Sequence, residues 1–391
     1  MADDLSVLVL CGRFPPATAI VRAFHDAGAR VDVADSLEMA PALHSNRADK
    51  THLVAAPARE PERFAHDVAA VVADRGIDLV LPSFEDTFFI ARYADLVPAP
   101  IFAPPFPVLA GLHDKSRFVE LCGRLGLRTP ATIVAGDSAE LADAVQQFPD
   151  FVARPAFSRG GMVYLTNHGP RAGESRLEDC SPTSDNPWLV QEYVEGADAC
   201  SYSVARDGQV LLHVAYEPRV TGPGGWSIQF ATVDDFGSLE VAQRVAGELG
   251  FTGHIGFDYR RTDDGLVMIE CNPRSSAGAF FPPGEWLVEA MVGQEPELRT
   301  APPGLVRQYD AYLLDRHLHR APPAQLVREL LHGRDALFDA HDVLPNLYFL
   351  LARRHWSTVA REEHVSVSQA FVADIAWDGT PMPEPQSPPA P

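Results

Sequence analysis

The chain has 391 residues, enough for two or three domains of typical size. Its composition, 46% hydrophobic and 22% charged, is that of an ordinary globular protein and excludes a mainly disordered one. An excess of 53 acidic over 32 basic residues gives a net charge of −21, which argues against binding nucleic acid or an anionic membrane through a basic face. No apolar run is long enough to span a membrane and the first residues do not resemble a secretory signal, so we expect a cytoplasmic protein.

Signals for strands and helices alternate over the first eighty residues. An apolar run at residues 5–10 predicts a buried strand, which a loop, an amphipathic helix and a second strand near residues 31–33 follow. A helix is predicted over residues 63–75, and a buried strand over residues 77–81 comes next. This alternation predicts a parallel α/β sheet whose ligand-binding loops lie at the carboxyl ends of the strands.

Two charged residues fall in such loops. Arg13 follows the first predicted strand, where it could bind the acid group of a substrate. Glu85 follows the strand at residues 77–81, where it could hold an amino group. The same positions also fit a surface ion pair for Arg13 and a charge at a helix N-terminus for Glu85.

The remaining chain has a different pattern. Five prolines within residues 97–107 indicate a domain boundary, which we place near residue 112. A helix at residues 115–125 and then short strands with Gly- and Pro-rich turns, up to about residue 300, predict an α+β region. Helices are expected at residues 324–331 and 344–353 and a strand at residues 371–377, and the proline-rich residues 378–391 are expected to be disordered.

A predicted hairpin carries two carboxylates. Two apolar runs flank an Asp-Asp-Gly turn, and a three-residue loop that pairs Thr262 with Leu266 sets Asp258 opposite Glu270. Asn272 lies on the same strand face as Glu270. Opposed carboxylates repel each other unless a cation lies between them, and Mg²⁺ suits such a site. The same spacing also fits a solvent-facing hairpin with unpaired acids, and a register shift of one residue would turn Asp258 away.

A Ser- and Gly-containing loop follows a predicted strand that begins at residue 151. Its glycines, Gly160 and Gly161, would let backbone N–H groups approach a polyphosphate, beside Ser158. Arg154, at the end of the strand, offers a planar set of donors to phosphate oxygens. An ordinary β-turn with a surface arginine also fits this stretch.

Two further stretches are suited to ligand contacts. The apolar strand at residues 188–192 ends in acids and glycine, so its free backbone groups could contact an adenine edge and Asp198 could bind ribose hydroxyls. A Gly- and Pro-rich loop at residues 222–225 resembles a lid over a small acid, with Arg219 as the clamp on a carboxylate or a γ-phosphate. A plain surface loop is the alternative for this second stretch.

Taken in order, five stretches resemble the motifs of the ATP-grasp family, and the second is similar to the ATP-grasp modules of carbamoyl phosphate synthetase. They are His113-Asp114-Lys115-Ser116, Arg154-Pro155-Ala156-Phe157-Ser158-Arg159-Gly160-Gly161, Gln191-Glu192-Tyr193-Val194-Glu195-Gly196, Asp258, and Glu270-Cys271-Asn272-Pro273-Arg274. The resemblance covers about residues 5–300. It implies an α/β plus α+β fold: a Rossmann-like preATP-grasp domain over residues 1–112, an ATP-grasp domain over residues 113–300 and a helical C-terminal extension over residues 301–377, before the tail at residues 378–391.

The resemblance, together with the loop and strand-end positions described above, gives expected roles for individual residues. The ATP-binding set comprises Lys115, Arg154, Ser158, Gly160, Gly161, Glu192, Tyr193, Val194 and Asp198. The ligands of Mg²⁺, or of Mn²⁺ in its place, are Asp258, Glu270 and Asn272. Arg274 and Arg219 are the expected catalytic residues, and the expected substrate contacts are Arg13, Glu85, Gly225, Ser227 and Ser275. Many members of the family carry Lys where Arg154 stands, and Arg keeps the charge there.

The activity that this family implies is ligation driven by ATP. A small carboxylic or amino acid becomes an acyl phosphate and is joined to an amine or a related nucleophile, with release of ADP and phosphate. The expected partners are therefore small-molecule carboxylate and amine substrates, with no nucleic acid and no membrane, and a homodimer is compatible with the sequence. Two alternatives stay open: a regulatory ATP-grasp protein that only binds nucleotide, and a small-molecule kinase with the same fold. Because 391 residues are far fewer than carbamoyl phosphate synthetase has, we do not expect the chain to be that enzyme.

Overall fold

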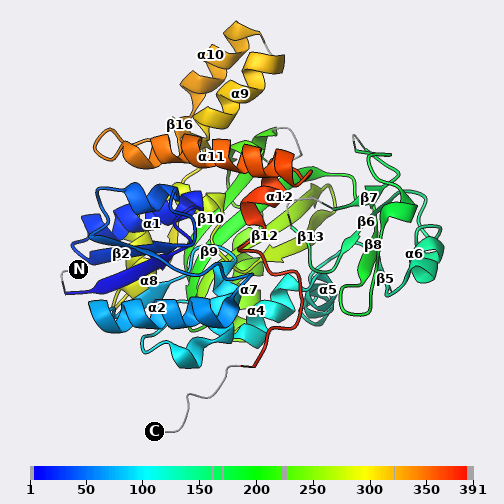
Figure 1. The fold of residues 1–391 in the computed structure, drawn as a ribbon. Coiled ribbons are helices and arrows are strands. Elements are labelled where there is room, and N and C mark those ends of the chain that lie inside the picture. The colour runs from blue at the N-terminus through cyan, green and yellow to red at the C-terminus, as the bar shows by residue number, and fades with distance from the viewer. Residues whose placement is uncertain (1–3, 160–162, 170, 222–226, 321, 385–391) are drawn as a thin grey trace.

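The computed structural model describes residues 4–159, 163–169, 171–221, 227–320 and 322–384, and they form three sheets with helices around them (Figure 1). The first sheet has the order β3-β2-β1-β4 and is parallel throughout. Its strands are β1 (Ser6–Leu10), β2 (Arg30–Asp35), β3 (Lys50–Leu53) and β4 (Leu79–Leu81), with helices α1 (Pro15–Asp26), α2 (Pro61–Arg75) and α3 (Asp86–Arg92). All five residues of β1 are buried, which explains its continuous apolar sequence. The predicted parallel α/β sheet is confirmed.

A small antiparallel sheet follows two helices that meet at Asp114, which caps the second helix through its side chain. The helices are α4 (Phe106–His113) and α5 (Lys115–Arg124). The sheet has the order β5-β8-β6-β7, and its elements are β5 (Thr132–Ala135), α6 (Ser138–Ala144), β6 (Phe151–Pro155), β7 (Leu165–Thr166) and β8 (Trp188–Glu192). It has a hydrophobic cluster of its own, which includes Leu141, Ala153 and Val190.

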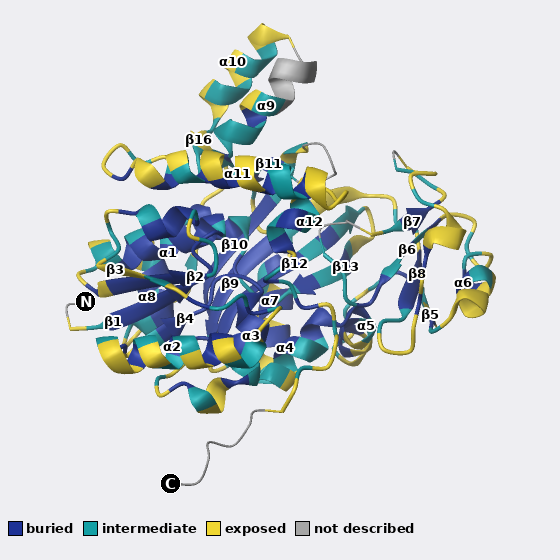
Figure 2. Ribbon diagram, viewed as in Figure 1, coloured by how far each residue is buried: buried dark blue, intermediate teal, exposed yellow. Residues whose placement is uncertain are grey.

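The largest sheet has eight strands in the order β13-β12-β9-β10-β11-β15-β16, with β14 beside β10. Its elements are β9 (Ala197–Arg206), β10 (Gln209–Thr221), β11 (Ser227–Thr232), α7 (Ser238–Leu249), β12 (Gly253–Thr262), β13 (Gly265–Asn272), α8 (Gly284–Val292), β14 (Arg299–Thr300), β15 (Val306–Gln308) and β16 (Arg334–Asp335). Phe24 of α1 and Val204 of β9 belong to one hydrophobic cluster, so the first and third sheets share a core. Figure 2 shows the buried strands at the centre of the molecule.

The C-terminal region is helical: α9 (Asp310–Arg320), α10 (Pro323–His332), α11 (Leu344–Glu362) and α12 (Val367–Val372). The strand predicted at residues 371–377 is wrong. Ser366 and Gln369 form a capping box that starts α12, and Ile375 and Trp377 after this helix are buried within a loop. Among the described residues, no helix is long and apolar enough to cross a membrane.

The disorder predicted for residues 378–391 is wrong for residues 378–384, which pack against the body. Tyr93 Oη donates to the Pro383 carbonyl at 3.0 Å, and Arg92 pairs with Glu384 at 2.7 Å. Trp377, just before this segment, is buried and anchors it. A proline-rich composition predicts disorder only where no such anchor exists. Residues 385–391 lie outside the described part of the chain.

Candidate functional site

The β12–β13 hairpin brings two carboxylates face to face. Asp258 pairs with Glu270, as predicted, but Thr262 pairs with Gly265 and not with Leu266. The turn is one residue shorter than expected, and an irregularity at Ile269 adds one residue to β13 and restores the register. The pairing of the two carboxylates is therefore confirmed, although the turn predicted to produce it is wrong.

The two carboxylates differ in their surroundings. Asp258 accepts a hydrogen bond from Asn272 Nδ2 at 3.1 Å, and burial, together with the charge of Glu270, raises the pKa of Asp258 to about 7. Burial alone would also raise the pKa of Glu270, but the charges of Lys115 and Arg154 hold it below its usual value. Glu270 is therefore paired with cations, whereas Asp258 faces a second carboxylate.

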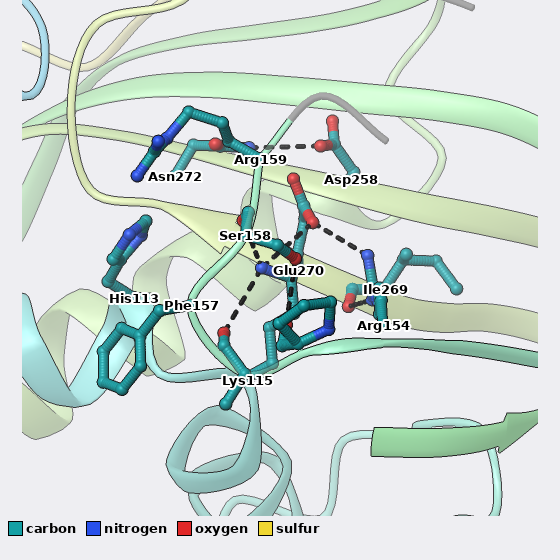
Figure 3. Close-up of polar contacts among 12 residues, drawn as sticks. His113, Lys115, Arg154, Phe157, Ser158, Arg159, Asp258, Ile269, Glu270 and Asn272 are labelled. Carbon is teal, nitrogen blue, oxygen red and sulfur yellow. Dashed lines mark hydrogen bonds and ion pairs between the residues drawn. The ribbon is translucent and has the colours of Figure 1, made fainter. Parts of the chain in front are cut away.

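The cations around Glu270 come from two different elements (Figure 3). Arg154 of β6 donates from Nη1 to Glu270 Oε2 at 2.9 Å and from Nη2 to the Ile269 carbonyl at 2.7 Å. Lys115, in the first turn of α5, lies 3.8 Å from the same carboxylate oxygen and donates to the Ser158 carbonyl. Burial lowers the pKa of Lys115 to about 8. These contacts join the small sheet, α5 and the hairpin at one point.

Arg274 lies just beyond β13, two residues after Asn272. Its Nη2 donates to Asn272 Oδ1 at 3.0 Å, and its guanidinium lies 4.4 Å from the centroid of the Phe84 ring. The Nε atom is 3.9 Å from Glu85 Oε1, so Arg274 also faces a carboxylate of the first sheet. Arg274 is thereby held beside the carboxylate pair.

A cavity of about 640 Å³ opens next to Glu270, between the small sheet and the large one. Of the residues predicted to bind ATP, those that line it are Arg154, Ser158, Glu192, Tyr193, Val194 and Asp198. Gly160 and Gly161 lie outside the described residues. The structure therefore gathers the described members of the predicted set around one cavity, with Lys115 beside it through Glu270.

Sequence analysis missed Arg260 among the cavity-lining residues. Its Nη1 pairs with Asp198 Oδ1 at 2.8 Å, and its guanidinium lies 5.9 Å from the Tyr193 ring centroid. Arg260 is two positions after Asp258 on β12, so strand alternation places both on one face and could have identified it. Tyr164, His168 and Arg171 also line the cavity, and no motif in the sequence indicated them.

Of the residues predicted to act at or beside the lid, the two described ones, Arg219 and Ser227, do not line the cavity. Arg219 lies on β10, is half exposed and pairs with Glu217 at 2.8 Å. Ser227 begins β11 and is not among the cavity-lining residues, whereas Thr221 at the end of β10 is. Gly225 lies outside the described residues. A direct role for Arg219 therefore stays a prediction.

The structure buries Arg13, Glu85 and Ser275, each with a partner from the chain itself, and their substrate contacts stay predictions. Arg13 binds Asp35 at 2.7 Å and Asp374 at 2.6 Å, so its ion pair is buried, which corrects the alternative of a surface ion pair. Glu85 is fully buried and accepts from Arg159 at 2.7 Å, and Ser275 Oγ donates to the Ser83 carbonyl. The strand-end loops are therefore filled by the protein.

Comparison with known proteins identifies the region that carries this site. A family model described as an ATP-grasp domain matches residues 112–278, which include the carboxylate pair and its cations. The chain carries an ATP-grasp domain. The C-terminal section of the carbamoyl phosphate synthase large chain of Methanopyrus kandleri is 27% identical to it over 185 residues, 44% of this chain and 34% of that protein. The arginine-specific large chain of Bacillus subtilis is 23% identical over 230 residues, 56% of this chain and 22% of that protein.

Solved structures show that the likeness in fold extends beyond the ATP-grasp domain. N5-carboxyaminoimidazole synthetase from Staphylococcus aureus complexed with ADP has a TM-score of 0.63 at 13% identity, over 81% of this chain and 87% of that one. An L-amino acid ligase from Bacillus licheniformis has a TM-score of 0.58 at 15% identity, over 78% of this chain and 79% of that one. The predicted ATP-grasp fold is thus confirmed. The chain matches only about a third or less of the length of the curated relatives named above.

Proposed function

We propose that this chain is an ATP-dependent ligase that activates a small carboxylic or amino acid as an acyl phosphate and joins it to an amine or a related nucleophile. The observation that carries the proposal is the Asp258–Glu270 pair, which lies within the ATP-grasp domain beside a cavity large enough for a nucleotide. Three relatives in sequence and fold are named as synthases or ligases, which agrees with this class of reaction. A cytoplasmic location stays a prediction from the sequence.

The donor set fits a hard divalent cation. Among the described residues, no cluster of three His, Cys, Asp or Glu side chains forms a complete protein-donated metal site. Two carboxylates and the Asn272 amide oxygen are nevertheless what Mg²⁺ or Mn²⁺ needs when water and phosphate oxygens complete the shell. When bound there with ATP, the metal would neutralise charge on the phosphate oxygens.

The chain's own residues would supply the rest of the chemistry. Lys115 and Arg154 would bind phosphate oxygens, since both already converge on the carboxylate at the cavity. Glu192, Tyr193 and Val194 would contact the base and Asp198 the ribose. Arg274 would stabilise the γ-phosphoryl group as it moves from ATP to a carboxylate oxygen of the acid, with ADP as the leaving group. The amine nitrogen then forms a bond to the acyl carbon and loses a proton, and the bond between that carbon and the phosphate oxygen breaks, so that phosphate leaves.

The test is release of ADP and phosphate by the purified chain with Mg-ATP, across panels of amino acids and small carboxylic acids with and without amines. A ligase gives an amide product only when both substrates are present, and hydroxylamine in place of the amine traps the acyl phosphate as a hydroxamate. A kinase would instead leave a stable phosphorylated product without any amine. Failure of the chain to bind Mg-ATP at millimolar concentration would refute the proposal.

A matched pair of variants links the activity to the site. Asp258→Asn removes one carboxylate of the pair and is expected to abolish turnover. Asp264→Asn makes the same chemical change at the exposed turn of the same hairpin and is expected to leave turnover unchanged. Equal activity of the two variants would contradict the assignment of Asp258.

A further inference from the structure

A segment that follows α12 runs along the first sheet toward the ATP-grasp domain. We call residues 374–380 the strap (Figure 1, red chain after α12). The strap begins at Asp374, whose carboxylate binds Arg13 Nη1 at 2.6 Å and Nη2 at 3.2 Å and also accepts from Ser36 Oγ at 3.0 Å. The Asp374 carbonyl accepts from the Ala58 N–H at 3.0 Å. Its start is therefore fixed at the carboxyl ends of β1 and β2.

Trp377 anchors the middle of the strap in a group of aromatic rings. Its ring centroid lies 5.2 Å from those of Phe106 and Phe157, 5.4 Å from that of Phe88 and 6.0 Å from that of His113. Trp377 is only 6% exposed, and its indole N–H donates to the Thr380 carbonyl at 2.8 Å. Phe157 belongs to the loop after β6, so the strap packs directly against the loop that follows Arg154.

The backbone of Trp377 makes a second set of contacts, which ends on Arg159. Its N–H donates to Glu85 Oε2 at 3.1 Å, and its carbonyl accepts from Arg159 Nη2 at 2.6 Å. The other oxygen of Glu85 accepts from Arg159 Nε at 2.7 Å. The guanidinium thus donates to two residues, Glu85 and Trp377, which are themselves joined by the hydrogen bond from the Trp377 N–H, so its orientation is fixed.

These contacts fix both side chains that flank Ser158. Ser158 and Arg159 line the cavity, and the Ser158 carbonyl accepts from Lys115 Nζ. Figure 3 shows Phe157, Ser158 and Arg159 together. Trp377 of the strap packs against Phe157 and accepts a hydrogen bond from Arg159, the two neighbours of Ser158. A long side chain such as Arg loses conformational entropy when it is held in one rotamer. Contacts with the strap and Glu85 already hold Arg159 without a ligand, so ligand binding does not have to order this side chain.

We propose that the strap is a positioning element of the nucleotide site: through Trp377 it orders residues 157–159, so that Ser158 and Arg159 are preorganised at the phosphate end of the cavity. The inference rests on the proposed function for the identity of the ligand, because the structure supplies only the cavity and the contacts. According to this proposal, tight nucleotide binding requires the strap, which lies outside the matched ATP-grasp region at residues 112–278.

The test uses Trp377→Ala, which removes the ring and its packing on Phe157. Hydrogen exchange of peptides that cover residues 157–159, measured without nucleotide, is expected to become faster by about tenfold or more. The KM for ATP is expected to rise by about tenfold while kcat changes by less than about threefold, because the strap touches no reacting group. Trp377→Phe keeps an aromatic ring in place and is expected to restore most of both properties.

A chain that ends at Thr380 is the matched control. It removes the contacts of Pro383 and Glu384 but keeps the strap, so its exchange at residues 157–159 and its KM for ATP should match those of the full chain. The proposal is overturned if Trp377→Ala lowers only the unfolding temperature, or if this control shows the same changes. The exchange measurement decides the positioning role even if the chain proves to use no ATP, so its failure is distinguishable from failure of the proposed function.

Discussion

The two members of the carboxylate pair, when replaced one at a time, should change the free energy of unfolding in opposite directions. Glu270 is paired with Arg154 at 2.9 Å and Lys115 at 3.8 Å, so Glu270→Gln leaves two largely buried cations without their carboxylate. Asp258 faces Glu270 and has no cation within ion-pair distance among the described residues. Asp258→Asn therefore relieves repulsion and keeps an oxygen that accepts from Asn272.

The expected change in the free energy of unfolding for each variant follows from the surroundings of the replaced carboxylate. Removing one partner of a fully buried ion pair costs about 3 to 5 kcal/mol. Glu270 is 15% exposed, so we expect a loss near the lower limit, about 3 kcal/mol. Like charges directly opposite on a sheet cost about 0.2 to 1 kcal/mol, which is the gain expected for Asp258→Asn. For a domain of the size of the ATP-grasp domain, each kcal/mol of stability corresponds to roughly 2 to 4 °C in unfolding temperature.

The assay is thermal unfolding of both variants and the parent at pH 7.5 in EDTA, which keeps divalent cations away from the site. Glu270→Gln should unfold at least about 6 °C below the parent, and Asp258→Asn at or slightly above it. Both variants should lose about a hundredfold or more in turnover with Mg-ATP. Shifts of the same sign and similar size would refute the assignment of the cations to Glu270 alone.

Two further predictions concern the packing around Tyr202. Burial lowers the pKa of His254, which lies 2.7 Å from Tyr202 Oη, to about 4 from 6.5. The unfolded chain therefore binds a proton between pH 6.5 and 4 that the folded chain does not, so stability should fall by up to about 3 kcal/mol as the pH drops through this window. Urea unfolding at pH 5 and 7 should show a smaller change for His254→Asn, and an equal change would contradict the assignment. A Cβ on Gly278 would lie 2.2 Å from Tyr202 Cβ, so Gly278→Ala should lose about 2 kcal/mol or more. Gly111→Ala, where nothing lies within 4 Å, should be neutral or stabilising in thermal unfolding, and similar losses for the two variants would argue against the clash.

The first sheet was predictable because its signals are local. Buried parallel strands are continuous apolar runs, and the helix between residues 61 and 75 ends at Gly76, which has a positive φ of 57°. The pairing of Asp258 with Glu270 was also predictable, yet two features of the hairpin were not. The two-residue turn and the irregularity at Ile269 each shift the register by one residue, and because their effects cancel, counting from a wrong turn gave the right pair.

The environments of Arg13 and Glu85 could not be predicted from local sequence. Asp374, whose carboxylate binds the guanidinium of Arg13, is 361 residues from Arg13 in the sequence. Trp377, whose N–H donates to Glu85, is 292 residues from Glu85. Strand and helix periodicity carry no information about contacts over such separations. The expectation of substrate contacts rested on where α/β sheets place ligands, and this position is occupied here by the protein's own C-terminal segment.

The long-range contact between Arg13 and Asp374 also has a consequence for synthesis on the ribosome. The loops at the carboxyl ends of β1 and β4 emerge among the first ninety residues, but the carboxylate and backbone groups that cover them are translated only after residue 373. A growing chain can therefore assemble the first sheet early while Arg13 and Glu85 still await these partners. Nascent chains that stop before Asp374 should leave this end of the sheet open to solvent and to chaperones, so its completion depends on groups that lie 361 and 292 residues further along the chain.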